Sequence, residues 1–153
     1  MQVVNEVFPS DPDRFRQMME EGPKGPIFMV NLLKFKERAE YKDGRPCDLS
    51  GREAYQIYGR AVSKLLSKFG GGAFFAGDVT FLALGQAEEL WDEIAIATYP
   101  NRKALFEMST SAEWQEISVH RDAGLKGQLN IETVLQDGVL GRLQPLLEAI
   151  TRG

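Results

Sequence analysis

The spacing of apolar residues along the chain predicts alternating strands and helices. Residues 27–36 are apolar on both faces of an extended strand, and on one face every second residue from Ile27 to Phe35 is apolar except Asn31. The segment 52–69 instead has apolar residues at offsets of 0, 3, 7, 10 and 14 from Tyr55, which form one helical stripe. A strand that is apolar on both faces needs cover on both sides. We therefore expect helices on one side of this strand and a second subunit on the other.

The same two patterns, alternation in strands and a spacing of three to four residues in helices, predict the elements that follow. The predicted strands span residues 73–85, 90–99 and 127–136, and the predicted helices span 101–108 and 111–123. We expect a bulge or bend at Gly77 and Asp78 in the first of these strands. Thr110 and Glu113 form a plausible capping box for the second helix, and Gly124 closes it.

Each end of the chain has a helical pattern outside this core. Ser10 or Asp11 can cap a short N-terminal helix that has Pro12 in its first turn. In the C-terminal segment 138–153, leucines recur with helical spacing, but Pro145 must kink that helix or begin a shorter one. Both ends are therefore predicted as helical extensions of a central domain.

The element order β-α-β-β-α-β predicts a ferredoxin-like α+β fold, with a four-stranded antiparallel sheet and helices on one face. We expect a single domain over residues 1–153, with an N-terminal helical extension (1–22), a core (26–135) and a C-terminal helical tail (138–153). The charged segment 37–51 contains two glycines and a proline, which predicts a long loop of the kind that often forms a lid or a binding segment.

Composition excludes several classes of protein and site. The chain has 153 residues, 18 of them basic and 22 acidic, which gives a formal charge of −4. With one histidine and one cysteine, Cys47, a single chain can build neither a multi-residue Cys/His metal site nor a disulfide framework. The acidic balance argues against nucleic acid or an anionic membrane as a partner. We predict no metal and no cofactor.

The N-terminal sequence predicts no export. MQVVNEVFPSDPDRF has no cationic start followed by an apolar block, so we expect no signal peptide. The longest apolar run, IFMVNLL, is much shorter than the ~20 residues of a membrane span. A lone cysteine without an export signal favours the reducing cytoplasm.

The segment 111–124 contains the histidine of the chain beside an arginine, and this pair is the sharpest chemical signal. On a helix, Arg121 continues the inward stripe of Trp114 and Ile117, where a cation is costly unless it is paired. In one interpretation, Arg121 holds an anionic or carbonyl group at a pocket mouth and the neighbouring His120 exchanges a proton. In the other, Arg121 pairs with a core carboxylate and His120 caps the helix C-terminus.

Five other side chains are candidate contacts for a substrate. They are Asn31, Tyr55, Tyr58, Trp91 and Asp92. Asn31 and Asp92 interrupt apolar strand faces, and a buried amide or carboxylate must find polar partners. For Asp92, that partner is equally Arg121, in a structural ion pair. The aromatic residues suit an aromatic or polycyclic ligand, although an aromatic stripe with helical spacing is also typical of a core.

Four motifs together resemble a known family. They are MVNLLKFK, a Tyr-x-x-Tyr-Gly helix, WDEIAIATYPNRKALFEM and VHRDAGL. In this order they are similar to the bacterial domain-of-unknown-function family 1330, of the dimeric α/β-barrel superfamily, over about Pro26 to Leu135. The resemblance implies a ferredoxin-like fold paired into a β-barrel dimer, with a ligand cavity between sheet and helices. Because the superfamily includes cofactor-free monooxygenases, lactone isomerases, haem-dependent enzymes and ligand binders, it implies no single reaction.

These observations lead to two principal hypotheses of function. The first is a homodimeric, cofactor-independent enzyme acting on a small organic acid or aromatic substrate, in which Arg121 anchors a carboxylate or enolate. In it, His120 is the general acid/base and Tyr58 or Asn31 orients the substrate. The alternative is a non-catalytic ligand-binding or sensory dimer that uses the same pocket. A haem-dependent role is third, with His120 as the possible histidine ligand.

Overall fold

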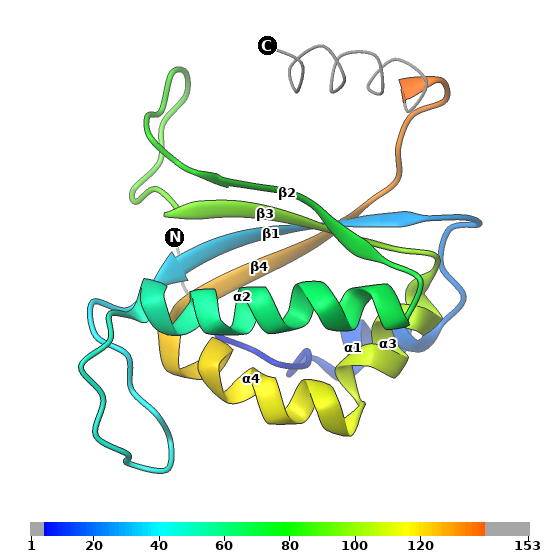
Figure 1. Cartoon of the computed structure of the whole chain (residues 1–153). Coiled ribbons are helices and arrows are strands. Elements are labelled where there is room, and N and C mark those ends of the chain that lie inside the picture. Colours follow the sequence, from blue (N-terminus) through cyan, green and yellow to red (C-terminus); the bar gives the residue numbers. More distant parts are fainter. Residues whose placement is uncertain (1–4, 140–153) are drawn as a thin grey trace, which may run out of the picture.

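The computed structural model describes residues 5–139 of the chain. The strands are β1 (Ile27–Phe35), β2 (Gly72–Asp78), β3 (Glu93–Tyr99) and β4 (Leu125–Thr133), and the helices are α1 (Pro12–Met19), α2 (Gly51–Lys68), α3 (Arg102–Ser109) and α4 (Ala112–Gly124). The sheet order is β2-β3-β1-β4, and every neighbouring pair is antiparallel. Figure 1 shows α2, α3 and α4 against one face of the sheet. This arrangement confirms the ferredoxin-like α+β prediction.

Two further predictions concern the ends of the chain and membranes. The predicted helical tail 138–153 lies, from residue 140 onward, outside the described residues. Within residues 5–139, no helix has the length and apolar character that crossing a membrane requires.

Helix α2 begins where the sequence predicts, because Ser50 and Glu53 form the expected capping box. The Ser50 hydroxyl accepts a hydrogen bond from the Glu53 N–H, and the Glu53 carboxylate accepts one from the Ser50 N–H at 2.7 Å. The apolar stripe then faces the sheet, where Tyr58 and Leu65 are buried in the main core. Burial of each such side chain contributes roughly 1.5–3 kcal/mol. This packing fixes which face of α2 lies over the sheet.

Helix α4 begins with a different cap from the predicted one. Ser111 is the N-cap, and its hydroxyl accepts from the Trp114 N–H at 3.2 Å. Thr110 instead ends α3, where its hydroxyl donates to the Phe106 carbonyl at 2.8 Å. The predicted capping box of Thr110 and Glu113 is therefore wrong, because the threonine hydroxyl already has its partner in the preceding helix.

Helices α2 and α4 meet at two glycines. A Cβ atom on Gly51 would lie 2.3 Å from the Lys36 carbonyl oxygen, and one on Gly124 would lie 2.3 Å from the Gly51 carbonyl oxygen. Only glycine permits so close an approach of two backbones. The Lys36 N–H donates to the Gly124 carbonyl at 2.9 Å, which ties the end of β1 to the same junction.

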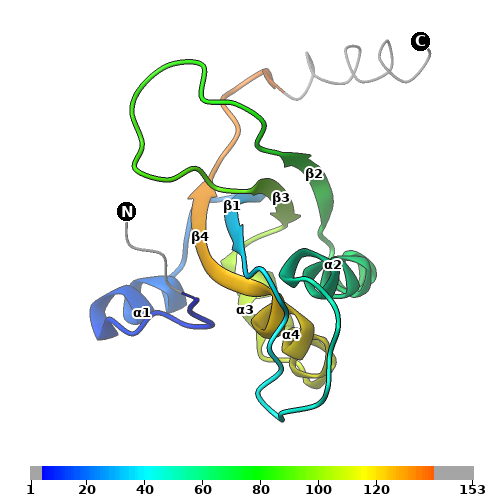
Figure 2. The ribbon, with the colours of Figure 1, turned by 90° about the vertical axis from the view of Figure 1, so that its left-hand side faces the viewer.

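Strand β2 is shorter than predicted, and its irregularity lies elsewhere. It pairs with β3 only as far as Asp78, whereas the prediction runs to residue 85. The two ends of the segment 79–92 are joined by a hydrogen bond from the Val79 N–H to the Asp92 carbonyl at 3.0 Å, and Figure 2 shows the segment as a loop that extends beyond the sheet. The register shifts between Ala73 and Phe75, so the bulge is there and not at Gly77 and Asp78.

The face of the sheet opposite the helices is apolar. Val30 of β1 pairs on this face with Ile96 of β3 and Ile131 of β4. Ile131 is 47% exposed, and the neighbouring Leu129 and Phe75 are also exposed. Within residues 5–139 no helix lies over this face, although Phe28 is buried there against Phe74. The expected helices on one side of β1 are present, and the other side is open.

The segment 36–50 is a loop, as predicted, but it packs against the helices. Ala39 is buried against Ala54 of α2 and Ala123 of α4, and the Glu40 N–H donates to the Ala123 carbonyl at 3.0 Å. Its residues line neither of the two cavities described below. The loop is therefore anchored at the ends of α2 and α4.

Candidate functional site

A cavity of about 300 Å³ lies between the sheet and the helices. The helix-facing positions of β3 are occupied by Ala95 and Ala97, whose small side chains leave space beneath α2. Most of the lining is apolar and includes Met29, Leu66 and Met108, while polar groups gather at one end. A concave, largely apolar space with a few convergent polar groups is typical of a small-molecule site.

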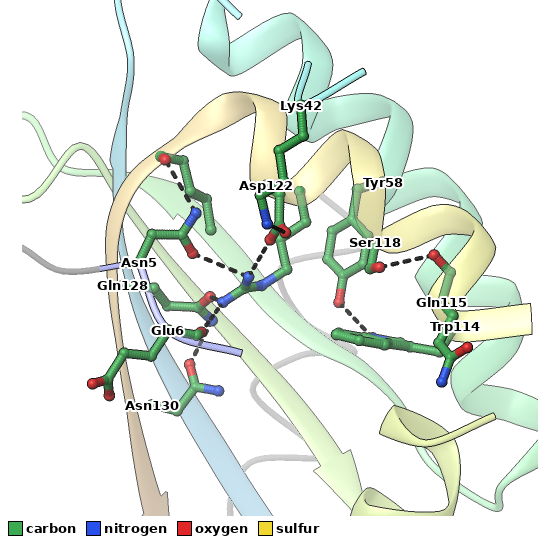
Figure 3. Close-up of polar contacts among 12 residues, drawn as sticks. Asn5, Glu6, Lys42, Tyr58, Trp114, Gln115, Ser118, Asp122, Gln128 and Asn130 are labelled. Carbon is green, nitrogen blue, oxygen red and sulfur yellow. Dashed lines mark hydrogen bonds and ion pairs between the residues drawn. The ribbon is translucent and has the colours of Figure 1, made fainter. Parts of the chain in front are cut away.

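Arg121 lies at the polar end of this cavity, and its guanidinium makes four hydrogen bonds. Figure 3 shows its partners Asn5, Glu6, Asp122 and Gln128 close together. Nη1 donates to the Asp122 carboxylate at 2.9 Å and to the Asn5 side-chain oxygen at 3.1 Å. Nη2 donates to Oε1 of Gln128 at 2.6 Å and to the Glu6 carbonyl oxygen at 2.7 Å. The residue is only 5% exposed, and these partners make the burial of its charge tolerable.

A row of amide side chains continues from Arg121 across the sheet. Gln128 donates through Nε2 to the Asn31 side-chain oxygen at 2.8 Å and to that of Asn130 at 2.5 Å. The Asn31 amide group in turn donates to two strand carbonyls, at 3.0 and 3.2 Å. Asn31 therefore lines the cavity, as predicted, and its amide also fixes the orientation of Gln128 beside Arg121.

Tyr55 and Tyr58 point from α2 into the cavity, with ring centroids 5.4 Å apart. The Tyr58 hydroxyl accepts from Trp114 Nε1 at 3.2 Å (Figure 3). Among residues 5–139, the hydroxyls of Tyr55 and Tyr99 have no hydrogen-bond partner, and both residues line the cavity. Burial raises the pKa of all three tyrosines, so their hydroxyls stay protonated and can donate to a ligand.

His120 lies outside this cavity, contrary to the expectation that it stands with Arg121 at a pocket mouth. Its Nδ1 is 2.6 Å from the hydroxyl of Tyr41, in the loop 36–50. Successive helical residues are about 100° apart, so α4 cannot direct both His120 and Arg121 toward the sheet. Burial, together with the nearby Arg45 charge, lowers the pKa of His120.

Trp91 and Asp92, which were predicted as substrate contacts, also lie outside the cavity. The Asp92 carboxylate accepts from Lys34 Nζ at 3.1 Å and from the Phe35 N–H at 2.8 Å. Lys34 belongs to the face of β1 that is turned away from the helices. The suggested ion pair between Asp92 and Arg121 is therefore wrong, because Asp92 binds Lys34 on one face of the sheet and Arg121 lies over the opposite face.

Residues 5–9 cross one side of the cavity. Val7 and Phe8 line it together with a neighbouring cavity of about 350 Å³, which α1, α3 and β4 border. Phe8 contacts Phe15 edge to face, with centroids 6.3 Å apart. Helix α1 follows, capped by Asp11, and none of its residues is buried. Figure 2 shows α1 beside β4, away from α2.

Three residues of the cavity could have been found from the sequence. Gln128 and Asn130 alternate with apolar residues, so a period of two places both amides on one face of β4. Glu93 stands next to Asp92 and therefore points to the opposite, helix-facing side. Asn5 and Glu6 gave no signal, because their contacts with Arg121 depend on the path of the N-terminal segment.

The cavity offers hydrogen-bond donors more than metal ligands. Within residues 5–139, no three His, Cys, Asp or Glu side chains are grouped so that they could hold a metal ion. His120 is engaged with Tyr41, and Cys47 is a free thiol in the loop 36–50. Arginine and tyrosine donors beside an apolar wall are suited to an anion or a carbonyl oxygen on an apolar ligand.

The chain is similar to several known proteins and families. The family model described as Domain of unknown function (DUF1330) matches residues 46–134. A solved structure of a protein of unknown function from Rhodopseudomonas palustris is 30% identical, with a TM-score of 0.73, over 87% of this chain and 99% of that one. The methylated form of that protein is 32% identical, with a TM-score of 0.72 over the same shares. No curated protein matches the chain.

A more distant similarity is to a dimeric ferredoxin-like protein of unknown function from Thermobifida fusca. It is 13% identical, with a TM-score of 0.44, over 76% of this chain and 99% of that one. The family match covers residues 46–134, which are more than half of the chain and include every element from α2 to β4. The chain therefore belongs to the domain-of-unknown-function family 1330.

Proposed function

We propose that this protein is a cofactor-independent enzyme acting on a small organic acid with an aromatic or other apolar part, bound in the cavity beneath α2. The observation that best supports this is Arg121, a buried guanidinium at the polar end of an otherwise apolar cavity. A guanidinium in such surroundings holds a carboxylate or enolate strongly and in a fixed direction. In this proposal Arg121 anchors the anion, and Tyr58 and Asn31 orient the rest of the ligand.

An anion can reach Arg121 by replacing two of its present partners. The Asn5 side-chain oxygen and the Glu6 carbonyl are neutral acceptors on a segment that contributes no fully buried side chain. A carboxylate is a charged acceptor with two oxygens, so its bonds to the guanidinium are stronger than theirs. Asp122 and Gln128 remain in place and keep the guanidinium oriented.

The remaining cavity suits the apolar part of such a ligand. Tyr55 and Tyr58 form a tilted pair, and Trp114 adds a third flat surface. A volume of about 300 Å³ matches the lower end of small-molecule sites. A single aromatic ring with a carboxylate is consistent with this shape.

The binding part of the proposal is tested by titrating the protein with benzoate and with its neutral analogue benzamide in a calorimeter. We expect benzoate to bind more tightly, and Arg121→Gln to weaken benzoate at least roughly tenfold, equal to about 1.4 kcal/mol. Benzamide affinity should change little, which shows that the variant is folded. Arg60→Gln, on the exposed surface of α2, is the matched control. Equal effects of Arg121→Gln on both compounds would contradict an anion site.

The second candidate is a non-catalytic ligand-binding or sensory dimer that uses the same cavity. The observation in its favour is the position of His120, the predicted acid/base, which is bonded to Tyr41 outside the cavity. The two candidates differ in turnover alone, since both require that the ligand binds at Arg121. Binding without turnover of any enolisable or oxidisable aromatic acid would support the second.

We also infer that the functional unit is a homodimer. The support is the apolar face of the sheet, where Leu129 and Ile131 are exposed and Ile94 and Ile96 are only partly buried within the described chain. A second copy of the same sheet is a surface of matching shape and apolar character, and it accounts for a strand that is apolar on both sides.

A further inference from the structure

Glu93 is a carboxylate inside the cavity that lacks a tight partner. It is the first residue of β3, pairs with Leu33 of β1, and its side chain is 18% exposed. Its ion-pair partner is Arg52, with Nη1 3.4 Å from Oε2, whereas the same Nη1 lies 2.5 Å from the Asp78 carboxylate. Arg52 is therefore committed mainly to Asp78, and Glu93 is only loosely neutralised.

The surroundings of Glu93 increase the affinity of its carboxylate for a proton. Burial raises its pKa; the Arg52 charge opposes this shift and the Asp78 charge adds to it. Tyr55 lies near enough for the charges of both Glu93 and Arg121 to affect its own pKa. A carboxylate whose pKa is raised by burial is a stronger base than an exposed one, which suits Glu93 to taking and returning a proton.

Glu93 and Arg121 are the two charged residues that the described chain contributes to the cavity lining, and they do not pair with each other. Leu33 of β1 pairs with Glu93 on one side and with Gln128 on the other, so these three residues form one row across the sheet. Two strand spacings separate the ends of the row by about 10 Å. Gln128 holds Arg121 at its end, so the row has an acid at one end and a cation at the other.

We propose that Glu93 is the catalytic acid/base of this cavity and that the substrate class is an enolisable aromatic oxo acid. The proposal rests on the proposed function, because Arg121 must hold the anionic end of the ligand. The Glu93 carboxylate removes a proton from the carbon next to the carbonyl. The C–H electron pair forms the new C=C bond, and the carbonyl π pair moves to oxygen as an enolate. Arg121 and the tyrosine hydroxyls stabilise that oxygen, and Glu93 returns the proton to carbon.

The test is exchange of the methylene protons of phenylpyruvate in D₂O, followed by proton NMR. We expect the protein to accelerate exchange by roughly 100-fold or more over the protein-free solution, the usual scale of acid/base catalysis. Glu93→Gln should reduce the rate to the protein-free value, and Glu93→Asp should give an intermediate rate. Glu116→Gln, which makes the same charge change on the exposed surface of α4, should keep the full rate.

Benzoate binding separates failure of this inference from failure of the proposed function. Glu93→Gln should bind benzoate at least as tightly as the natural protein, because a negative charge near the anion is removed. Benzoate binding without accelerated exchange overturns the role of Glu93 and leaves the anion site standing. Exchange that persists in Glu93→Gln also overturns it. Tight binding of phenylalanine without exchange would instead make Glu93 a countercharge for an ammonium group, and absence of any binding would overturn both proposals.

Discussion

At the residue scale, two glycines decide how the side chains of the cavity meet. Gly51 and Gly124 let the backbones of α2 and α4 touch, which brings Tyr55 and Arg121 to the same cavity from two helices. A Cβ atom at Gly124 would meet the Gly51 carbonyl oxygen and also the Tyr55 N–H, at 2.9 Å. Both are backbone atoms, which cannot move aside as a flexible side chain can.

Gly124→Ala should therefore destabilise the protein by about 1–3 kcal/mol, the usual cost of overpacking. Urea unfolding measures the change. Gly59→Ala is the matched control, since a Cβ there meets no atom within 4 Å, and alanine in a helix should stabilise by about 0.5–1 kcal/mol. Similar effects of both substitutions would contradict a steric role for the junction.

The contact of His120 with Tyr41 predicts how stability depends on pH. Burial and Arg45 lower the pKa of His120 in the folded protein, so below about pH 6.5 the unfolded chain binds this proton more readily. Stability should therefore fall as the pH is lowered from about 7.5 to 5.5. In His120→Gln this fall should be smaller, as measured by urea unfolding at both pH values. An identical fall in the two proteins would show that His120 does not titrate in this range.

At the element scale, the N-terminal segment occupies positions on Arg121 that the proposed ligand would take. Asn5 and Glu6 supply two of the four acceptors on the guanidinium, and Phe8 lines both cavities. The segment is held by hydrogen bonds and by the contact of Phe8 with Phe15. Loosening that contact favours the arrangement in which the guanidinium is free for a ligand.

Phe8→Ala should consequently tighten benzoate binding several-fold, because an aromatic pair contributes about 0.5–1.5 kcal/mol. Calorimetric titration measures this, and Phe81→Ala in the exposed loop 79–92 is the control. Weaker binding in Phe8→Ala would mean that the phenyl ring belongs to the wall that the ligand contacts.

At the scale of the whole molecule, the sheet has two apolar faces, and the described chain covers one. The helices cover the face that bears the cavity (Figure 1). The other face bears the exposed Leu129 and Ile131. An exposed apolar surface of this kind is typical of a protein–protein interface.

Sedimentation equilibrium should therefore show a dimer for the natural protein. Ile131→Asp should shift it toward the monomer, because a carboxylate would be buried without a partner in the interface. Val119→Asp is the matched control, since Val119 is also apolar and 40% exposed but lies on α4. A dimer that survives Ile131→Asp unchanged would assign the interface to another surface.

Sequence reasoning predicted elements better than it predicted the site. The apolar stripe that begins at Tyr55 and the apolar residues on both faces of β1 are patterns among neighbouring residues. For this reason α2, β1 and the order of the elements followed from spacing alone. The alternation of Gln128 and Asn130 was equally local and was overlooked. The position of His120 outside the cavity is also local, because successive helical residues point about 100° apart. Its contact with Tyr41, 79 residues away in the chain, has no such local signal.

The amino-acid sequence alone is sufficient to predict the helices and strands from their periodicity, the capping box of α2 and the inward position of Arg121. These depend on neighbouring residues and on fixed backbone geometry. The partners of Arg121, from Asn5 and Glu6 to Gln128, and the contact of His120 with Tyr41 depend instead on the tertiary structure. A hydrogen bond between distant segments depends on how helices pack on the sheet. No pattern of spacing along the chain encodes that packing.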